Sequence, residues 1–174
     1  MFTMTTWLAR LDARDRALYS RCLLRPTGAN TVRVLWRGIT HIGGARATIG
    51  ACFLLLAFPS ISLLMAWRVL LLLGISHAVV QVIKRCVGRP RPVAHDSMPL
   101  LVEVPDRFSF PSGHACAAMA VAVGFASYFP AFSLPLMVLA ILVGFSRVVL
   151  GVHYPGDVVV GQTVALITAF PLFG

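Results

Sequence analysis

Three short polar clusters stand at the ends of otherwise apolar segments of this 174-residue chain, at 84–92, 111–114 and 146–157. Together they supply three cations, two imidazoles and one carboxylate: Lys84, Arg91, Arg147, His114, His153 and Asp157. Charge beside a membrane is costly and is usually functional. Because cations bind phosphate oxygens and imidazoles act as nucleophiles or proton carriers, the clusters predict a membrane-embedded phosphatase.

The composition places the chain in a lipid bilayer. Apolar residues make up 58% of it and charged residues 12%, with a mean hydropathy of +0.84, far from the values of a soluble domain. The net charge is +9, but the basic residues flank apolar runs and form no solvated stripe with interleaved aromatics. This pattern argues against a nucleic-acid partner and favours lipid headgroups or an anionic substrate.

The distribution of charge predicts an all-α helical bundle with about five transmembrane helices in a single domain, 1–174. We expect spans near 44–60 and 63–84, two more between 108 and 146 around a turn at 128–135, and a last one over 158–174. An antiparallel bundle of this order places the three clusters on one face of the membrane. Residues far apart in the sequence can therefore converge on one pocket.

An arginine-rich amphipathic segment, 1–43, precedes the expected transmembrane core, 44–174. Leucines and Trp7 recur in it at near-helical spacing, with arginines between them, and a break at 26–28 separates a second short helix from Asn30 to about His41. Two interpretations fit the first helix. It lies in the interface of an anionic membrane, or it packs against the bundle. No signal peptide is visible.

The second cluster has the sequence of a helix start. Ser112 is expected to cap the helix that follows, and Gly113 lets a backbone N–H approach a ligand closely. A helix N-terminus of this kind binds anions. An ordinary helix start explains the same four residues, so both interpretations stay open for this cluster taken alone.

In the third cluster, His153 and Asp157 lie four residues apart across the turn at 155–156. Asp157 can cap the next helix and accept the Nδ1–H of His153, which leaves Nε2 free as a nucleophile. The alternative is a capping aspartate beside a structural histidine. The other histidines have no motif around them and are assigned no chemistry: His41, His77 and His95. Within its span, His77 is expected to bond between helices.

In the first cluster, Lys84 and Arg91 are separated by six residues around Gly88, where a helix must end. Both cations can therefore turn toward one site, where Arg offers two parallel donors to phosphate and Lys adds a point charge. Anchoring of the span by positive charge is the other interpretation, and we assign that role to Arg85 and Arg89.

Neither a metal nor another cofactor is expected. The cysteines are scattered without a C-x-x-C pair, which predicts no disulfide framework and no zinc site: Cys22, Cys52, Cys86 and Cys116. The sequence also contains no cluster of carboxylates that could bind a metal.

Taken in order, the patterns K-x6-R-P, P-S-G-H and S-R-x5-H-x3-D resemble the signature of the type 2 phosphatidic acid phosphatase superfamily, which also includes vanadium haloperoxidases. The resemblance covers 84–157, and the matching residues are Lys84, Arg91, Pro92, Pro111, Ser112, Gly113, His114, Ser146, Arg147, His153 and Asp157. It implies metal-independent hydrolysis of a lipid phosphate through a phosphohistidine intermediate.

In this family pattern His153 attacks phosphorus, Asp157 orients it, and His114 protonates the leaving oxygen. The phosphate oxygens are held by Lys84, Arg91, Ser112, Gly113 and Arg147. Phosphatidic acid, phosphatidylglycerophosphate, a polyprenyl (pyro)phosphate and a lipid A phosphate all fit such a site. A vanadate-dependent haloperoxidase, a lipid-phosphate transporter and a non-catalytic lipid-binding module are the alternatives.

The charge distribution also bears on the membrane side, although the sequence gives no indication of oligomeric state. Eight arginines lie before or at the start of the first expected span, the last of them Arg46, whereas the face opposite the clusters carries only Arg68 near a span end. The positive-inside rule therefore predicts that the N-terminus and the active site face the cytoplasm of a bacterial inner membrane.

Overall fold

The computed structural model describes residues 4–23, 30–58, 62–92, 102 and 106–174. The elements in chain order are α1 (Met4–Cys22), α2 (Asn30–Ile42), α3 (Ala45–Leu54), η1 (Leu55–Ala57), α4 (Leu63–Val87), α5 (Gly113–Tyr128), η3 (Pro130–Phe132), α6 (Ser133–Val149) and α7 (Pro155–Phe173). The described ranges are almost entirely helical, which confirms the all-α prediction. The boundary between the first two expected spans, near 60, the break at 26–28, His95 and most of residues 93–110 lie outside the described residues.

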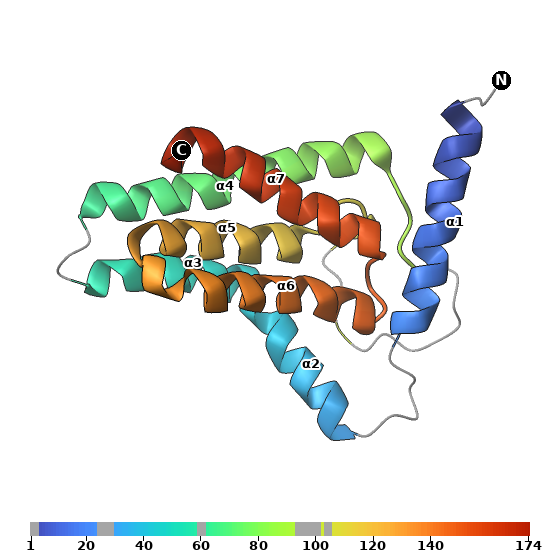
Figure 1. The fold of residues 1–174 in the computed structure, drawn as a ribbon, viewed down its shortest axis with the longest axis horizontal. Coiled ribbons are helices and arrows are strands. Elements are labelled where there is room, and N and C mark those ends of the chain that lie inside the picture. Colours follow the sequence, from blue (N-terminus) through green and yellow to red (C-terminus); the bar gives the residue numbers. More distant parts are fainter. Residues whose placement is uncertain (1–3, 24–29, 59–61, 93–101, 103–105) are drawn as a thin grey trace.

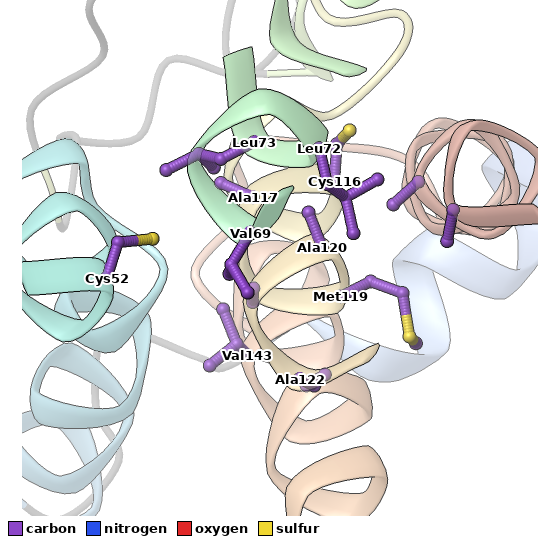
Figure 2. Packing of buried hydrophobic residues seen from close by; sticks show 14 of the residues in the cluster. Cys52, Val69, Leu72, Leu73, Cys116, Ala117, Met119, Ala120, Ala122 and Val143 are labelled. Carbon is purple, nitrogen blue, oxygen red and sulfur yellow. The ribbon is translucent and has the colours of Figure 1, made fainter. Parts of the chain in front are cut away.

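Helix α5 is the centre of the bundle. It packs against α3, α4, α6 and α7, while α2 diverges from the bundle on the α6 side (Figure 1). Its buried residues are mostly alanines, and Gly124 is so close to α4 that an added Cβ would overlap the Val69 side chain. Figure 2 shows this core, with Val69, Leu72 and Val143 around the small residues of α5. Small residues of this kind allow close helix packing in a membrane.

Three helical segments are long and apolar enough to cross a membrane: Leu63–Val87, Pro130–Val149 and Pro155–Phe173. A fourth is possible if α2 and the α3–η1 segment, which meet at a bend of 55°, form one broken span. The fifth expected span is α5, which is apolar but shorter. Since α5 is surrounded by other helices, protein rather than lipid covers most of its length. The protein is an integral membrane protein with a bundle close to the predicted one.

The ends of four helices meet at one end of the bundle, as the antiparallel order predicts. These are the C-terminal ends of α4 and α6 and the N-terminal ends of α5 and α7 (Figure 1). Helix α1 lies across the same end and contacts α6 and α7. The N-terminal helix therefore packs against the bundle, which is one of the two arrangements that its amphipathic pattern allows.

Local sequence signals set these helix ends. Gly88 terminates α4 in the left-handed conformation, with φ of 63°, and its N–H donates to the carbonyl of Lys84 at 3.0 Å. Ser112 is the N-cap of α5, as predicted, and its side chain accepts the N–H of Ala115. The Ser112 N–H in turn donates to the Asp157 carbonyl at 2.8 Å, which ties the start of α5 to α7.

The close contact between α5 and α7 depends on Gly161, because a Cβ there would overlap the Ser112 backbone. We expect Gly161→Ala to lower the free energy of unfolding in detergent by about 1–3 kcal/mol, the usual cost of overpacking. Gly50→Ala is the matched control, since Gly50 is also helical but has open space where its Cβ would lie. There alanine should raise the stability slightly, by up to about 1 kcal/mol, through its better helix propensity. Thermal unfolding of both variants checks this, and equal stabilities would contradict it.

Candidate active site

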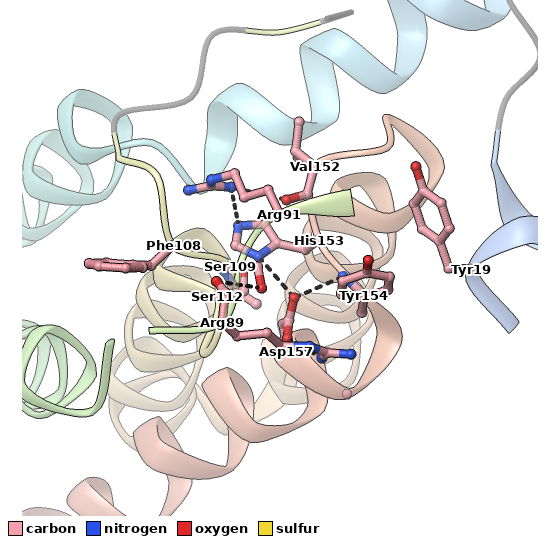
Figure 3. Close-up of polar contacts among 12 residues, drawn as sticks. Tyr19, Arg89, Arg91, Phe108, Ser109, Ser112, Val152, His153, Tyr154 and Asp157 are labelled. Atoms are coloured by element: carbon pink, nitrogen blue, oxygen red, sulfur yellow. Dashed lines mark hydrogen bonds and ion pairs between the residues drawn. The ribbon is translucent and has the colours of Figure 1, made fainter. Parts of the chain in front are cut away.

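A cavity of about 1170 Å³ opens at the end of the bundle where the four helix ends meet. Six of the eight predicted site residues line it: Lys84, Arg91, Gly113, His114, Arg147 and His153. The other two, Ser112 and Asp157, are fully buried. Asp157 lies directly behind His153 (Figure 3). The three sequence clusters therefore share one site, although their catalytic and phosphate-binding roles stay predictions.

His153 is buried in the loop between α6 and α7, with an exposed fraction of 2%. The Nη1 atom of Arg91 lies 3.1 Å from its Nε2 (Figure 3). A guanidinium can only donate, so Nε2 is the unprotonated nitrogen and Nδ1 carries the ring proton. Burial, followed by the charges of Arg147, Arg91 and Lys84, holds the pKa of His153 well below its ordinary value. The imidazole is therefore neutral, as a nucleophile must be.

Asp157 stands behind the other ring nitrogen. Its Oδ2 lies 3.5 Å from Nδ1 of His153, close but without hydrogen-bond geometry, and accepts the N–H of Tyr154 at 2.9 Å. The prediction that Asp157 itself caps α7 needs correction. The helix begins at Pro155, so Tyr154 is the N-cap and Asp157 is the third helical residue, which bonds back to the cap.

Lys84 and Arg91, predicted to bind phosphate, both bind the carboxylate of Asp106 in this structure. Lys84 Nζ lies 2.9 Å from its Oδ2, and Arg91 Nη2 lies 3.0 Å from its Oδ1. Burial raises the pKa of Asp106, but the hydrogen bonds and charges of Lys84 and Arg91 outweigh it and hold that pKa below its ordinary value. Sequence reasoning assigned no role in the site to Asp106. The available signal was its position just before the second cluster, in a chain with six acidic residues.

Arg147 is the most deeply buried cation of the site, with an exposed fraction of 1%. Its Nη1 donates to Oγ1 of Thr40 at 2.8 Å, while Nε and Nη2 have no partner among the described residues. Thr40, at the end of α2, is a positioning residue that sequence reasoning missed. A buried guanidinium with two unpaired nitrogens on a cavity wall is suited to bind an anion.

His114 follows Gly113 in the first turn of α5 and faces the turn between α2 and α3. A Cβ on Gly43 would press on the His114 carbonyl, and one on Gly44 would lie 3.8 Å from the His114 Nε2. The two glycines thus let this turn pack directly against the second imidazole. Ser112 caps the helix and lies off the cavity wall, so the structure gives it a structural contact, while its predicted contact with phosphate stays a prediction.

Two further residues differ from expectation. His77, expected to bond between helices, bonds instead within its own helix, with its Nε2 3.1 Å from the Gln81 Nε2, and its side chain lines the cavity. Arg89, assigned to membrane anchoring, has a largely buried side chain that binds three carboxylates, those of Asp12, Asp15 and Asp157. Across the described ranges, no group of three or more His, Cys, Asp or Glu residues is arranged to hold a metal.

Comparison with known proteins agrees with the resemblance in the sequence. Residues 65–173 match the PAP2 superfamily. The decaprenylphosphoryl-5-phosphoribose phosphatase of Mycobacterium tuberculosis is 39% identical over 130 residues, which cover 72% of this chain and 70% of that protein. The protein of the same name from Mycolicibacterium smegmatis is 46% identical over 91 residues, and there the match spans about half of each chain, 50% of this one and 47% of the other.

Among solved structures, the transmembrane PAP2 type phosphatidylglycerolphosphate phosphatase of Bacillus subtilis superimposes with a TM-score of 0.75 at 27% identity. The superposition covers 94% of this chain and 84% of that one. The similarity therefore includes the bundle as well as the polar clusters. Because the family match extends over more than half of the sequence and contains all three clusters, the chain belongs to the PAP2 superfamily and is a membrane-embedded phosphatase.

Proposed function

We propose that this phosphatase hydrolyses a phosphate monoester or diphosphate on a membrane lipid, through a phosphohistidine formed at His153. The observation that carries the proposal is the shape of the cavity. Its polar end holds the cations and imidazoles, and its other end is an apolar groove between α3 and α4, with Ile49 and Phe53 on one wall and Trp67 and Leu70 on the other.

This groove leads from the site to the outer surface of the bundle. Phe53 and Trp67, at the apolar end, have exposed fractions of 57% and 54% on helices that lie in the membrane. A lipid whose phosphate binds among the cations can therefore keep its hydrocarbon chain in an apolar environment. A soluble phosphate ester or a halide has no hydrocarbon chain that could occupy such a groove. The groove therefore favours a lipid phosphatase over a haloperoxidase.

The chemistry follows from the positions of the two imidazoles. Nε2 of His153 attacks phosphorus while the bond from phosphorus to the lipid oxygen breaks, and His114 gives a proton to that oxygen. Asp157 supports the positive charge that develops on the His153 ring. In the second step His114 takes a proton from water, which attacks phosphorus, breaks the N–P bond and releases inorganic phosphate.

The cations hold the phosphate during both steps. Lys84 and Arg91 would donate to the phosphate oxygens while they stay paired with Asp106. Arg147 has two nitrogens without a partner among the described residues, and Gly113 offers its N–H at the start of α5. Three cations and one carboxylate leave two net positive charges, which match a phosphate monoester dianion. Preorganised donors of this kind are usually the largest contribution to catalysis.

The names of the relatives narrow the lipid class. Two of them act, by name, on a polyprenyl-linked phosphoribose, and the B. subtilis structure on phosphatidylglycerolphosphate. The identity to the first two, 46% and 39%, is higher than the 36% to the phosphatidylglycerophosphatase B of Bacillus subtilis, which favours a polyprenyl-linked phosphate for this chain. On the positive-inside rule we further propose that the active site faces the cytoplasm of a bacterial inner membrane, since the arginine-rich α1 lies at the same end of the bundle.

The first test is phosphate release in the presence of EDTA from detergent-dispersed polyprenyl diphosphate, decaprenylphosphoryl-5-phosphoribose, phosphatidylglycerophosphate, phosphatidic acid and lipid A. We expect release from at least one of them, strongest for a polyprenyl-linked phosphate.

Loss of the nucleophile in His153→Ala should lower turnover by about 10³-fold or more, by analogy with other nucleophiles. Near-normal turnover in a folded His153→Ala protein would exclude the phosphohistidine mechanism.

A second test separates the roles of the two imidazoles. If His114 protonates the leaving oxygen, His114→Ala should slow hydrolysis of lipid phosphates with poor alkoxide leaving groups far more than that of an activated aryl phosphate. The aryl leaving group needs little protonation in the transition state. The ratio of kcat values for the two substrates measures this, and equal losses on both would show that His114 only positions the phosphate.

The membrane side is tested by thiol labelling. Arg107 lies next to Asp106 and is exposed, so Arg107→Cys on a background without the four native cysteines marks the mouth of the site. In intact cells we expect an impermeant thiol reagent to leave this cysteine unlabelled, and to label it after the membrane is opened. Labelling in intact cells would place the active site on the outer face instead.

A further inference from the structure

We propose that Arg89, which occupies one of the six unspecified positions between Lys84 and Arg91 in the first motif, is a positioning residue that orients Asp157 toward His153 and joins helix α1 to this catalytic pair. The inference rests on the proposed function, in which His153 is the nucleophile. It concerns a residue to which the motif assigns no role, and whose side chain neither lines the cavity nor binds the phosphate-binding cations. The contacts that support it lie on the side of Asp157 that faces away from His153.

Arg89 is a single cation among three carboxylates. Its Nη1 lies 2.7 Å from Oδ1 of Asp157 and 2.8 Å from Oδ2 of Asp15, and its Nη2 lies 2.7 Å from Oδ1 of Asp12. The guanidinium carbon also lies 4.0 Å from the centre of the Tyr154 ring, a cation–π contact. Both terminal nitrogens and the face of the guanidinium are thus engaged, so the side chain has little freedom to move.

The two oxygens of Asp157 have separate partners. Oδ1 accepts from Arg89, while Oδ2 accepts the Tyr154 N–H and faces Nδ1 of His153 at 3.5 Å (Figure 3). With Oδ1 bound in this way, the carboxylate cannot rotate, and Oδ2 stays directed at the imidazole. Asp157 is fully buried, so removing Arg89 would leave Oδ1 as a buried charge without a compensating cation.

The catalytic pair is consequently bound by an arginine at each end. Arg91 donates to Nε2 of His153, and Arg89, two residues earlier, donates to the carboxylate at the opposite side. The short segment that carries both arginines is itself held by Ser109, whose N–H donates to the Arg89 carbonyl at 2.8 Å. One chain segment therefore sets both the tautomer of the nucleophile and the direction of its carboxylate.

Helix α1 completes the arrangement. Besides binding Arg89, Asp15 accepts the Gly156 N–H at 2.7 Å through Oδ1, at the start of α7. Tyr19, one turn further along α1, packs edge-on against Tyr154, with ring centroids 5.3 Å apart. The amphipathic N-terminal helix is therefore attached to the loop that carries the nucleophile. Its docking supports the geometry of the site from outside the region that matches the family, 65–173.

The kinetic test uses Arg89→Ala, Arg89→Lys and the matched control Arg85→Ala, which removes an exposed arginine from the last turn of α4, four residues before Arg89. We expect Arg89→Ala to lower kcat by about 10²-fold, the effect typical of residues that orient a reacting group, with KM changed less than about threefold because the phosphate-binding cations are untouched. Arg89→Lys should recover part of kcat, and Arg85→Ala should match the wild type. An unchanged kcat, or a loss confined to KM, would overturn the inference.

A double-variant cycle tests the coupling to Asp157. If Arg89 acts through that carboxylate, adding Arg89→Ala to Asp157→Ala should cause little further loss of kcat. Full additivity of the two losses would contradict the inference. Asp15→Asn, which leaves Arg89 its other two carboxylates, should give a smaller loss of about threefold to tenfold and covers the case that Arg89→Ala does not fold.

A spectroscopic readout separates this inference from the proposed function. The imidazole ¹⁵N resonances of His153, assigned by their loss in His153→Ala, report the tautomer without any substrate. We expect Nδ1 protonated and Nε2 unprotonated in the wild type, and a mixture of tautomers in Arg89→Lys and Asp15→Asn. An unchanged tautomer in both variants would refute the positioning role even if the enzyme is fully active. Absence of phosphate release from every lipid, with the tautomer shift present, would instead refute the proposed function alone.

Discussion

The need to compensate buried charge governs this structure. Asp157 is enclosed at one end of an apolar bundle and is stable there as an ion because Arg89 and the Tyr154 N–H bind its two oxygens. Asp106 is likewise bound by Lys84 and Arg91. Because an isolated charge in an apolar environment costs much free energy, the charged side chains of these pairs stay bound to one another and are each held in one position. Arg147, by contrast, has two nitrogens without a partner among the described residues, on the cavity wall where an anion can bind.

This charge network exists only because the helices approach each other closely. The alanine-rich α5 lets four neighbours surround it, and Gly161 brings α7 against the cap of α5, so that Ser112 and Asp157 are joined through their backbones. Gly43 and Gly44 bring the α2–α3 turn onto His114 in the same way. The site is rigid where it holds the imidazoles and open where the groove between α3 and α4 meets the lipid. That combination suits chemistry on a phosphate whose remaining part stays in the bilayer.

Local signals in the sequence were sufficient for the ends of α4 and α5 that face the site and for six residues of the cavity wall. Gly88 and Ser112 end and begin helices through backbone conformation and capping, which depend on neighbouring residues alone. An apolar run has a length that can be compared with the bilayer, so four of the expected spans coincide with α4, α5, α6 and α7. The first expected span was less accurate, because η1 ends at Ala57 and the helix bends at Gly43–Gly44.

The sequence by itself determined the class of the protein, the order of its helices and the clusters that share one face, since each follows from composition, hydrophobic length or residue type at fixed spacing. Only the tertiary structure decided which charges pair. Asp106 with Lys84, Thr40 with Arg147 and Arg89 with Asp157 are contacts between segments 22 to 107 residues apart. A charge pair has no periodicity in the sequence, so its partner is selected by the packing of helices and not by any local pattern.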